Sequence, residues 1–369
     1  MIRRTRHKLL LCAAVLLPIP AFSQSWIVGP FDRPTTTPVI TPDANRTFRD
    51  PLSQQIVHWE AEHTFNPAAV LEGNKVAVLY RAEDDTGHEA IGGHTSRLGL
   101  AESSDGIHFT RLPEPVFYPA KDSQQDREWP GGVEDPRLVQ TDDGLYVLTY
   151  TQWNRKAYTV GIATSKDLRQ WTKYGPAFAG ARSGKYNDLN YKSAGILTEE
   201  KNGRLVAARL HGVYWMYWGE VEVRLATSPD LIHWTPVEDA TGNPKVLLRA
   251  RPGLFDSGFP EVGAPPLLLP QGIIVFYNGK NAASGGDPTI GPGAYSAGQA
   301  LFSSDDPTRL IVRTDHPYLK PELPFEKSGQ YAAGTVFTEG LVLLNQRFFL
   351  YYGTADSFVG VASTVPQGH

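Results

Sequence analysis

Cysteine is almost absent from this chain of 369 residues, whose one cysteine, Cys12, lies in an apolar run near the N-terminus. A disulfide framework is therefore excluded, and so is chemistry that depends on a thiolate. We expect no metal site, because no cysteine ligand is available and the histidines are scattered along the sequence. We expect no cofactor either, because glycine pairs such as Gly131-Gly132 lack the context of a phosphate-binding loop.

Positive charge is also scarce, with 35 Lys and Arg against 39 Asp and Glu. Four of the basic residues precede the apolar run LLLCAAVLLPIPA: Arg3, Arg4, Arg6 and Lys8. Together with the small residues Ala21 and Ser23, this pattern predicts a signal peptide over residues 1–23 and export to the periplasm or the cell exterior. Without those four residues, 31 basic side chains face 39 acidic ones, and a net charge near −8 argues against a nucleic-acid partner. No later run is long and apolar enough to span a membrane.

Convincing helical periodicity is missing as well, and a β-rich unit recurs five times instead. The units can be aligned on one small or apolar residue each, with steps of 62, 63, 75 and 61 residues: Ala101, Ala163, Ala226, Leu301 and Ala362. Each unit has room for about four short strands. The sequence therefore predicts an all-β protein, a single five-bladed β-propeller over residues 24–369. The Pro- and Gly-rich segment 281–298 accounts for the longer fourth step.

The units differ most at the phase where an inner strand would meet a central pocket. There they carry polar residues: Asn66, Glu134, Asp135, Lys192, Glu261 and, after a second strand, Asp356. Carboxylates that converge on one pocket raise one another's pKa toward the range of a general acid. Four aromatic residues suit a sugar-binding cleft: Trp153, Trp215, Tyr217 and Trp218. Three others recur at one phase, where we expect them to pack between the units: Phe109, Trp171 and Trp234.

Several motifs in this frame carry a family resemblance. They include FNPA (65–68), LYR (79–81), GGVEDPRL (131–138), KSAGIL (192–197), VGAPPLLL (262–269) and LYYGTADSFVGVA (350–362). Through them the chain resembles glycoside hydrolase family 130, the β-mannoside phosphorylases and β-mannosidases. The resemblance implies a five-bladed propeller that acts on β-mannosides with inversion.

The resemblance also implies roles for individual residues. Asp135 is expected to be the proton donor, acting through a hydroxyl of the bound mannose. Asn66, Arg81 and Asp356 fall where the family holds the mannosyl unit, and Glu134 and Lys192 are expected to contact the substrate as well. The expected partner is thus a mannoside or manno-oligosaccharide.

The nucleophile is predicted from departures from the phosphorylase pattern. Lys192-Ser193 stands where the resemblance leads us to expect an Arg-Asn pair in the phosphorylases. Glu261 stands in place of a lysine, and Glu220 adds a further acid. Two carboxylates repel phosphate and can activate water. We therefore predict an exported inverting β-mannosidase, in particular a β-1,2-mannosidase, with Asp135, Glu220 and Glu261 as catalytic residues. The alternatives are a β-mannoside phosphorylase, another five-bladed glycosidase such as an arabinan- or fructan-cleaving type, and a sugar-binding propeller without catalysis.

Overall fold

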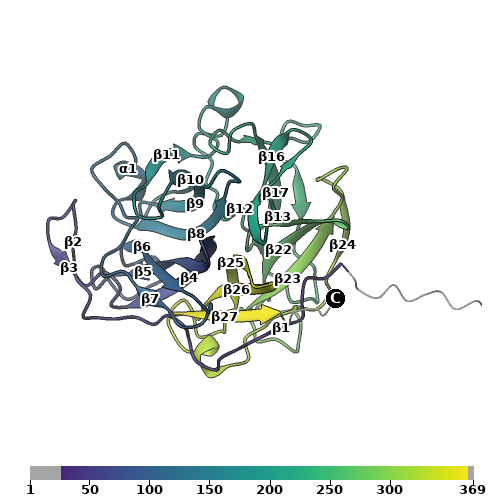
Figure 1. The fold of residues 1–369 in the computed structure, drawn as a ribbon. Coiled ribbons are helices and arrows are strands. Elements are labelled where there is room, and N and C mark those ends of the chain that lie inside the picture. The colour runs from purple at the N-terminus through teal and green to yellow at the C-terminus, as the bar shows by residue number, and fades with distance from the viewer. Residues whose placement is uncertain (1–25, 365–369) are drawn as a thin grey trace, which may run out of the picture.

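The computed structural model describes residues 26–364 and is nearly all-β (Figure 1). The predicted signal peptide, residues 1–23, lies outside the described residues. Within the described range the helical elements are one α-helix and two 3-10 helices: α1 (Gln125–Glu128), η1 (Ala181–Gly184) and η2 (Pro324–Lys327). None of the helices in this part of the chain has the length and apolarity needed to cross a membrane. The predicted all-β class is confirmed.

The first two units fold as antiparallel meanders in which consecutive strands pair. The first contains β4 (His63–Glu72), β5 (Lys75–Glu83), β6 (Ser96–Ser103) and β7 (Thr110–Arg111). The second contains β8 (Gly132–Gln140), β9 (Tyr146–Trp153), β10 (Tyr158–Ser165) and β11 (Thr172–Pro176). A parallel contact between Ser96 and Gly132 joins the two meanders into one sheet.

The third and fourth units are less regular. The third pairs β12 (Ala194–Ile196), β16 (Val213–Trp218), β17 (Val223–Ser228) and β18 (Thr235–Pro236), with β15 (Arg209–Leu210) and β19 (Val246–Leu248) at its edges. In the fourth, β20 (Phe259–Val262) and β21 (Leu267–Leu269) both pair with β22 (Gly272–Lys280), followed by β23 (Tyr295–Phe302) and β24 (Leu310–Arg313). The hairpin β13 (Thr198–Lys201) and β14 (Arg204–Ala207) joins the edge of this sheet at β21.

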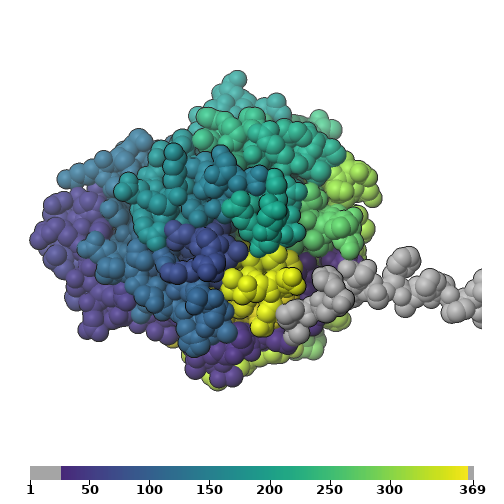
Figure 2. Space-filling view, in the orientation of Figure 1, coloured from purple at the N-terminus to yellow at the C-terminus, as the bar shows by residue number. Residues whose placement is uncertain are grey.

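The fifth meander takes a strand from the start of the chain. It contains β25 (Phe337–Leu344), β26 (Arg347–Thr354) and β27 (Phe358–Thr364), and its outer strand is β1 (Phe31–Asp32), with Phe31 opposite Thr364. In the space-filling view, yellow C-terminal surface adjoins purple N-terminal surface (Figure 2). The hairpin β2 (Phe48–Arg49) and β3 (Ile56–Val57) stands apart from the meanders.

Five hydrophobic clusters lie between the meanders. Each cluster joins two consecutive meanders, and one of them joins the fifth meander to the first through residues such as Val78 and Tyr351. A fully buried large apolar side chain contributes about 1.5–3 kcal/mol, so these seams supply most of the apolar stabilisation. Phe109, Trp171 and Trp234 pack on three of the clusters, which confirms their predicted role.

Candidate active site

All eight predicted site residues line one cavity of about 360 Å³. They come from all five meanders: Asn66 and Arg81 from the first, Glu134 and Asp135 from the second, Lys192 and Glu220 from the third, Glu261 from the fourth and Asp356 from the fifth. Neighbouring inner strands are in contact, with β4 between β25 and β8. The cavity therefore lies where the starts of these strands converge.

Irregular backbone aims two of these side chains into the cavity. The pairing of β4 with β5 shifts register between Phe65 and Pro67, and that of β8 with β9 shifts between Glu134 and Arg137. The residues at these bulges, Asn66 and Asp135, have left-handed φ values of 45° and 47°. Such a conformation is costly for a non-glycine residue and is retained where a bulge redirects a side chain. As a result, the Asn66 amide donates to Oδ1 of Asp135 at 2.8 Å.

Arg81 is the cation around which the acids of the first two meanders gather. Its Nη1 donates to Asp135 Oδ1 at 3.0 Å, and its Nη2 donates to Glu134 at 2.9 Å and to Glu83 at 2.7 Å. The guanidinium also lies 4.5 Å from the centre of the Phe65 ring. Burial lowers the pKa of Arg81, but the three carboxylates outweigh it and raise that pKa overall. The side chain is held rigidly in its charged form.

The two adjacent acids differ in their pKa. Burial alone raises the pKa of Asp135, but Arg81 and Lys192 outweigh burial and lower it to about 2. Burial raises the pKa of Glu134 to about 7 in spite of the opposing charge of Arg81. In the free protein the proton that this pair retains near neutral pH therefore resides on Glu134, while Asp135 is ionised.

A second charged group lies across the cavity. Lys192 Nζ is 3.5 Å from Glu220 and 3.6 Å from Glu261, and Ser193 donates a short hydrogen bond to Glu261. The backbones of Glu220 and Glu261 pair directly, so these two acids converge as predicted. Burial raises the pKa of Glu261 to about 7, with Lys192 opposing it. Burial lowers the pKa of Lys192, but the two carboxylates outweigh this effect. The pKa of Lys192 is therefore raised well above its ordinary value.

Asp356 occupies the turn between β26 and β27 with a left-handed φ of 50°. Burial raises the pKa of its carboxyl to about 6, against the charge of Arg81. Gln330 holds the turn by donating to the Asp356 carbonyl at 2.9 Å. On the adjoining strand β4, the Asn66 Oδ1 atom is buried without a hydrogen-bond partner. This acceptor is available to a ligand hydroxyl.

Aromatic residues form part of the cavity wall, but only one of the four predicted aromatics is among them. Trp153 lines the cavity with Tyr158, Tyr295, Tyr331 and Phe337. Tyr217 and Trp218 are instead buried in clusters between meanders, and Trp215 packs beside one of them. The prediction for these three was wrong because both faces of β16 are covered: Trp215 and Tyr217 pack toward the fourth meander, and Trp218 packs toward the second.

Two buried acids next to the site residues were not predicted from the sequence. Glu83 is fully buried beside Arg81, and Glu339 is fully buried with one carboxylate oxygen 2.8 Å from Arg137. Arg137 further donates to the carbonyls of Asp135, Val262 and Gly263. This side chain therefore connects the second meander to the fourth and fifth. A partial signal was present in GGVEDPRL, where Arg137 follows the two acids.

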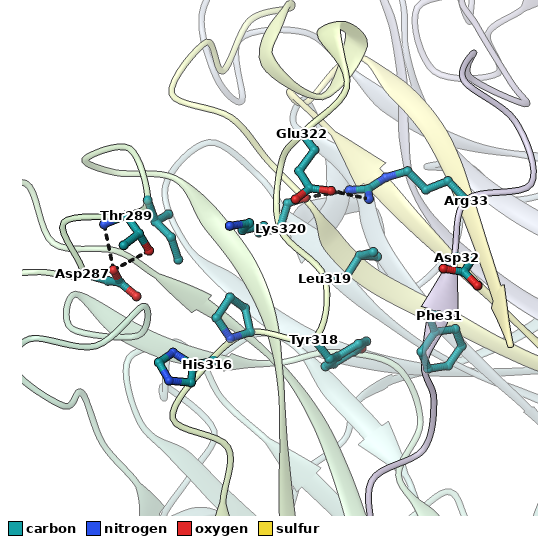
Figure 3. A pocket seen from close by; sticks show the side chains of 12 residues that line it. Phe31, Asp32, Arg33, Asp287, Thr289, His316, Tyr318, Leu319, Lys320 and Glu322 are labelled. Atoms are coloured by element: carbon teal, nitrogen blue, oxygen red, sulfur yellow. Dashed lines mark hydrogen bonds and ion pairs between the residues drawn. The ribbon is translucent and has the colours of Figure 1, made fainter.

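A larger cavity of about 430 Å³ lies elsewhere, beside β1 (Figure 3). Three of its charged side chains already have partners: Arg33 contacts Glu322 at 3.2 Å, and Asp287 accepts hydrogen bonds from Thr289. This cavity gathers no convergent set of acids.

Comparisons with known proteins agree with the motifs. A family model, glycoside hydrolase family 130, described as β-1,4-mannooligosaccharide phosphorylase, matches residues 33–367. A 1,2-β-oligomannan phosphorylase of Thermoanaerobacter sp. is 33% identical over 82% of this chain and 90% of its own length. A β-1,2-mannobiose phosphorylase of the same organism is 28% identical over 86% and 95%.

One solved structure is 53% identical, with a TM-score of 0.91 over 93% of this chain and 96% of the other. Its description states that the family of mannoside phosphorylases contains glycoside hydrolases that target β-1,2 mannosidic linkages in Candida mannan. The curated relatives are named as phosphorylases, however, and they contradict the predicted hydrolase. The phosphorylase alternative is the better supported of the two.

Proposed function

Because the chain belongs to glycoside hydrolase family 130, we propose that it cleaves β-1,2-linked mannosides by phosphorolysis, with inversion to α-mannose 1-phosphate. The observation that carries this proposal is one cavity in which Asp135, bound by Arg81 and Asn66, faces Lys192 across the strand ends. The linkage comes from the names of the curated relatives.

Each side of the cavity has a part in this proposal. Asn66, Arg81 and Asp356 hold the hydroxyls of the mannosyl unit, and Asp135 passes a proton to the leaving oxygen through a mannose hydroxyl. On the other side Lys192 supplies positive charge to phosphate. Glu261, protonated below its pKa of about 7, supplies a hydrogen-bond donor.

The test is to incubate the purified protein with β-1,2-mannobiose in the presence and absence of inorganic phosphate. We expect turnover only with phosphate, and mannose 1-phosphate as the product. Water is the competing acceptor, because glycoside hydrolases occur in the same family. Release of free mannose at one rate with and without phosphate would overturn the proposal.

Changes to the mannosyl-binding side chains should weaken action on every substrate alike. Arg81→Lys and Asp356→Asn each lose hydrogen bonds to a charged group, which contribute about 1.5–3 kcal/mol each, or roughly 10- to 150-fold in kcat/KM. The measurement compares β-1,2-mannobiose with longer oligomers. A loss confined to one chain length would place these residues outside the mannosyl subsite.

Phosphate affinity should depend on pH through Glu261. Because burial raises its pKa to about 7, Glu261 becomes anionic above that pH and repels phosphate, so KM for phosphate should rise between pH 6 and 8. Glu261→Gln stays neutral and should show a flatter profile. Because phosphate ionises in the same way for both proteins, the ratio of their KM values isolates the effect of Glu261. Parallel profiles for the two proteins would remove Glu261 from the phosphate site.

We also propose that the five meanders are the blades of a single propeller over residues 24–369. The support is the cluster that joins the fifth meander to the first, and the shared sheet of β1 and β27.

We propose in addition that the protein is exported, with cleavage after residue 23. N-terminal sequencing of the protein recovered from the producing cells and their medium tests it, and an intact Met1 terminus would count against it.

A further inference from the structure

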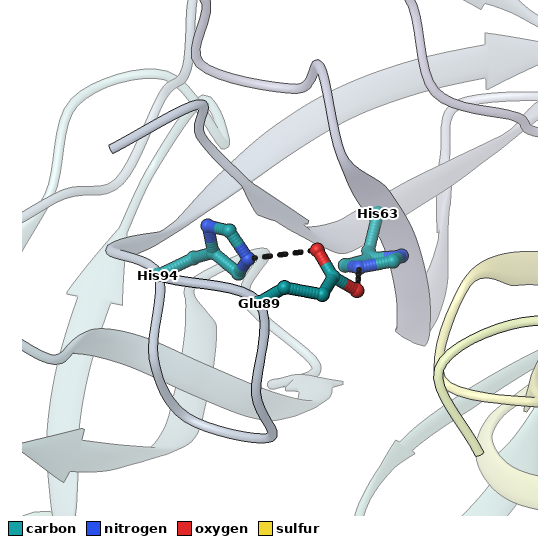
Figure 4. Close-up of side chains that lie close together, drawn as sticks. All are labelled: His63, Glu89 and His94. Carbon is teal, nitrogen blue, oxygen red and sulfur yellow. Dashed lines mark ion pairs between the residues drawn. The ribbon is translucent and has the colours of Figure 1, made fainter. Parts of the chain in front are cut away.

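Two histidines and a glutamate meet beside the cavity, although the histidines looked scattered in the sequence. His63 begins β4, while Glu89 and His94 belong to the loop 84–95 between β5 and β6 (Figure 4). The possible ligand atoms of these three side chains lie within 4.8 Å of one another. None of the three lines the cavity itself.

The hydrogen bonds of the two rings leave one nitrogen of each free. Nδ1 of His94 lies 2.8 Å from the Thr86 carbonyl, which can only accept, so Nδ1 carries the hydrogen and Nε2 of the neutral ring keeps a lone pair. Nδ1 of His63 is engaged by Ser357 Oγ at 2.9 Å. The Nε2 atoms of both rings are buried and have no hydrogen-bond partner. Contacts of this kind at the other nitrogen also orient metal-binding histidines.

The distances to Glu89 fit a bridging ion better than direct contact. Nε2 of His63 is 3.6 Å from one carboxylate oxygen, and Nε2 of His94 is 3.5 Å from the other. These separations are too long for good hydrogen bonds. They are close to the separation of about 3.3 Å between two ligand atoms that bind the same tetrahedral zinc ion.

Both imidazole rings are shielded from solvent, whereas the carboxylate is not. His63 and His94 are 8% and 5% exposed. The Glu89 side chain is 68% exposed, which gives an ion a route from solvent.

We propose that His63, Glu89 and His94 form a binding site for one divalent metal ion, zinc fitting this ligand set best. Two histidines and a carboxylate are a known zinc set, with the fourth position left to water. The ion ties the loop 84–95 to β4. Because Ile91 and Gly92 of this loop line the cavity, the metal fixes one wall of the cavity without entering it.

The test uses zinc alone on protein that has been stripped with a chelator. Calorimetric titration with zinc chloride should show one ion per chain. His94→Gln and Glu89→Gln should each lower the affinity by at least about 10- to 100-fold, the loss seen when even outer contacts of a metal site are removed. His88→Gln, an exposed histidine of the same loop, is the matched control and should bind like the native protein.

A second measurement follows the loop directly. A glutamyl endopeptidase that cuts after Glu89 should act more slowly on the native protein when zinc is present, and zinc should not protect His94→Gln. No zinc uptake by the native protein, or equal affinity in His94→Gln, overturns the site. Zinc binding without protection from the protease overturns the claim that the metal fixes the loop 84–95. Glu89→Gln alters an exposed residue, so misfolding does not obscure its titration.

Discussion

Asp135→Asn should lower turnover of β-1,2-mannobiose by about 10²- to 10⁴-fold, the usual contribution of general acid–base catalysis. The asparagine keeps the shape of the side chain and can still accept hydrogen bonds from Asn66 and Arg81. It cannot pass a proton to the leaving group. The measurement is kcat at saturating phosphate, with the urea midpoint of the variant as a check that it remains folded.

Glu134→Gln is the matched control, because Glu134 adjoins Asp135 and contacts the same guanidinium. In the free protein Asp135 is ionised and Glu134 has the raised pKa, so Asp135 must take up a proton from Glu134 or from solvent when the substrate binds. We expect a smaller loss for Glu134→Gln. An equal or larger loss, with Asp135→Asn near normal, would make Glu134 the acid.

Arg137→Met should destabilise the protein by about 3–5 kcal/mol, the cost of breaking a buried ion pair by removing one partner. Arg137 is 1% exposed, pairs with the fully buried Glu339, and binds three backbone carbonyls of two meanders. The free energy of unfolding from urea titration measures the effect.

Two further variants separate the charge from the packing. Arg204→Met removes a half-exposed arginine that contacts Asp142, and it should cost about 0–1 kcal/mol. The double variant Arg137→Met with Glu339→Leu removes both buried charges and should recover part of the loss. If the double variant is as unstable as the single one, the carbonyl contacts of Arg137 dominate instead.

The repeat made the main features of this protein predictable. Because equivalent strands recur at one phase, residues such as Asn66, Asp135 and Glu261 could be assigned to a common pocket although up to 195 positions separate them. The same logic placed Trp234 in a seam between meanders. It could not place Glu83, because that residue binds Arg81 on its own strand, and the repeat phase does not mark such a contact.

Other features depend on distances that only folding sets. Arg137 and Glu339 are 202 residues apart, and nothing in either segment specifies their contact.

The choice of nucleophile was wrong for a related reason. Glu220 and Glu261 were taken as two negative charges, whereas burial makes Glu261 neutral up to a pH of about 7. The sequence shows the residue type, but the folded environment decides its protonation.

The pairing of β1 with β27 has a consequence for how this chain folds. Phe31 meets Thr364, so nearly the whole described chain forms the loop that this contact closes. Loop-closure entropy grows with length, and contacts of such separation slow folding, so we expect this pairing to form last. The strand that leaves the ribosome first would then wait for the last one, and the start of the chain would be among the last parts of the protein to find its place.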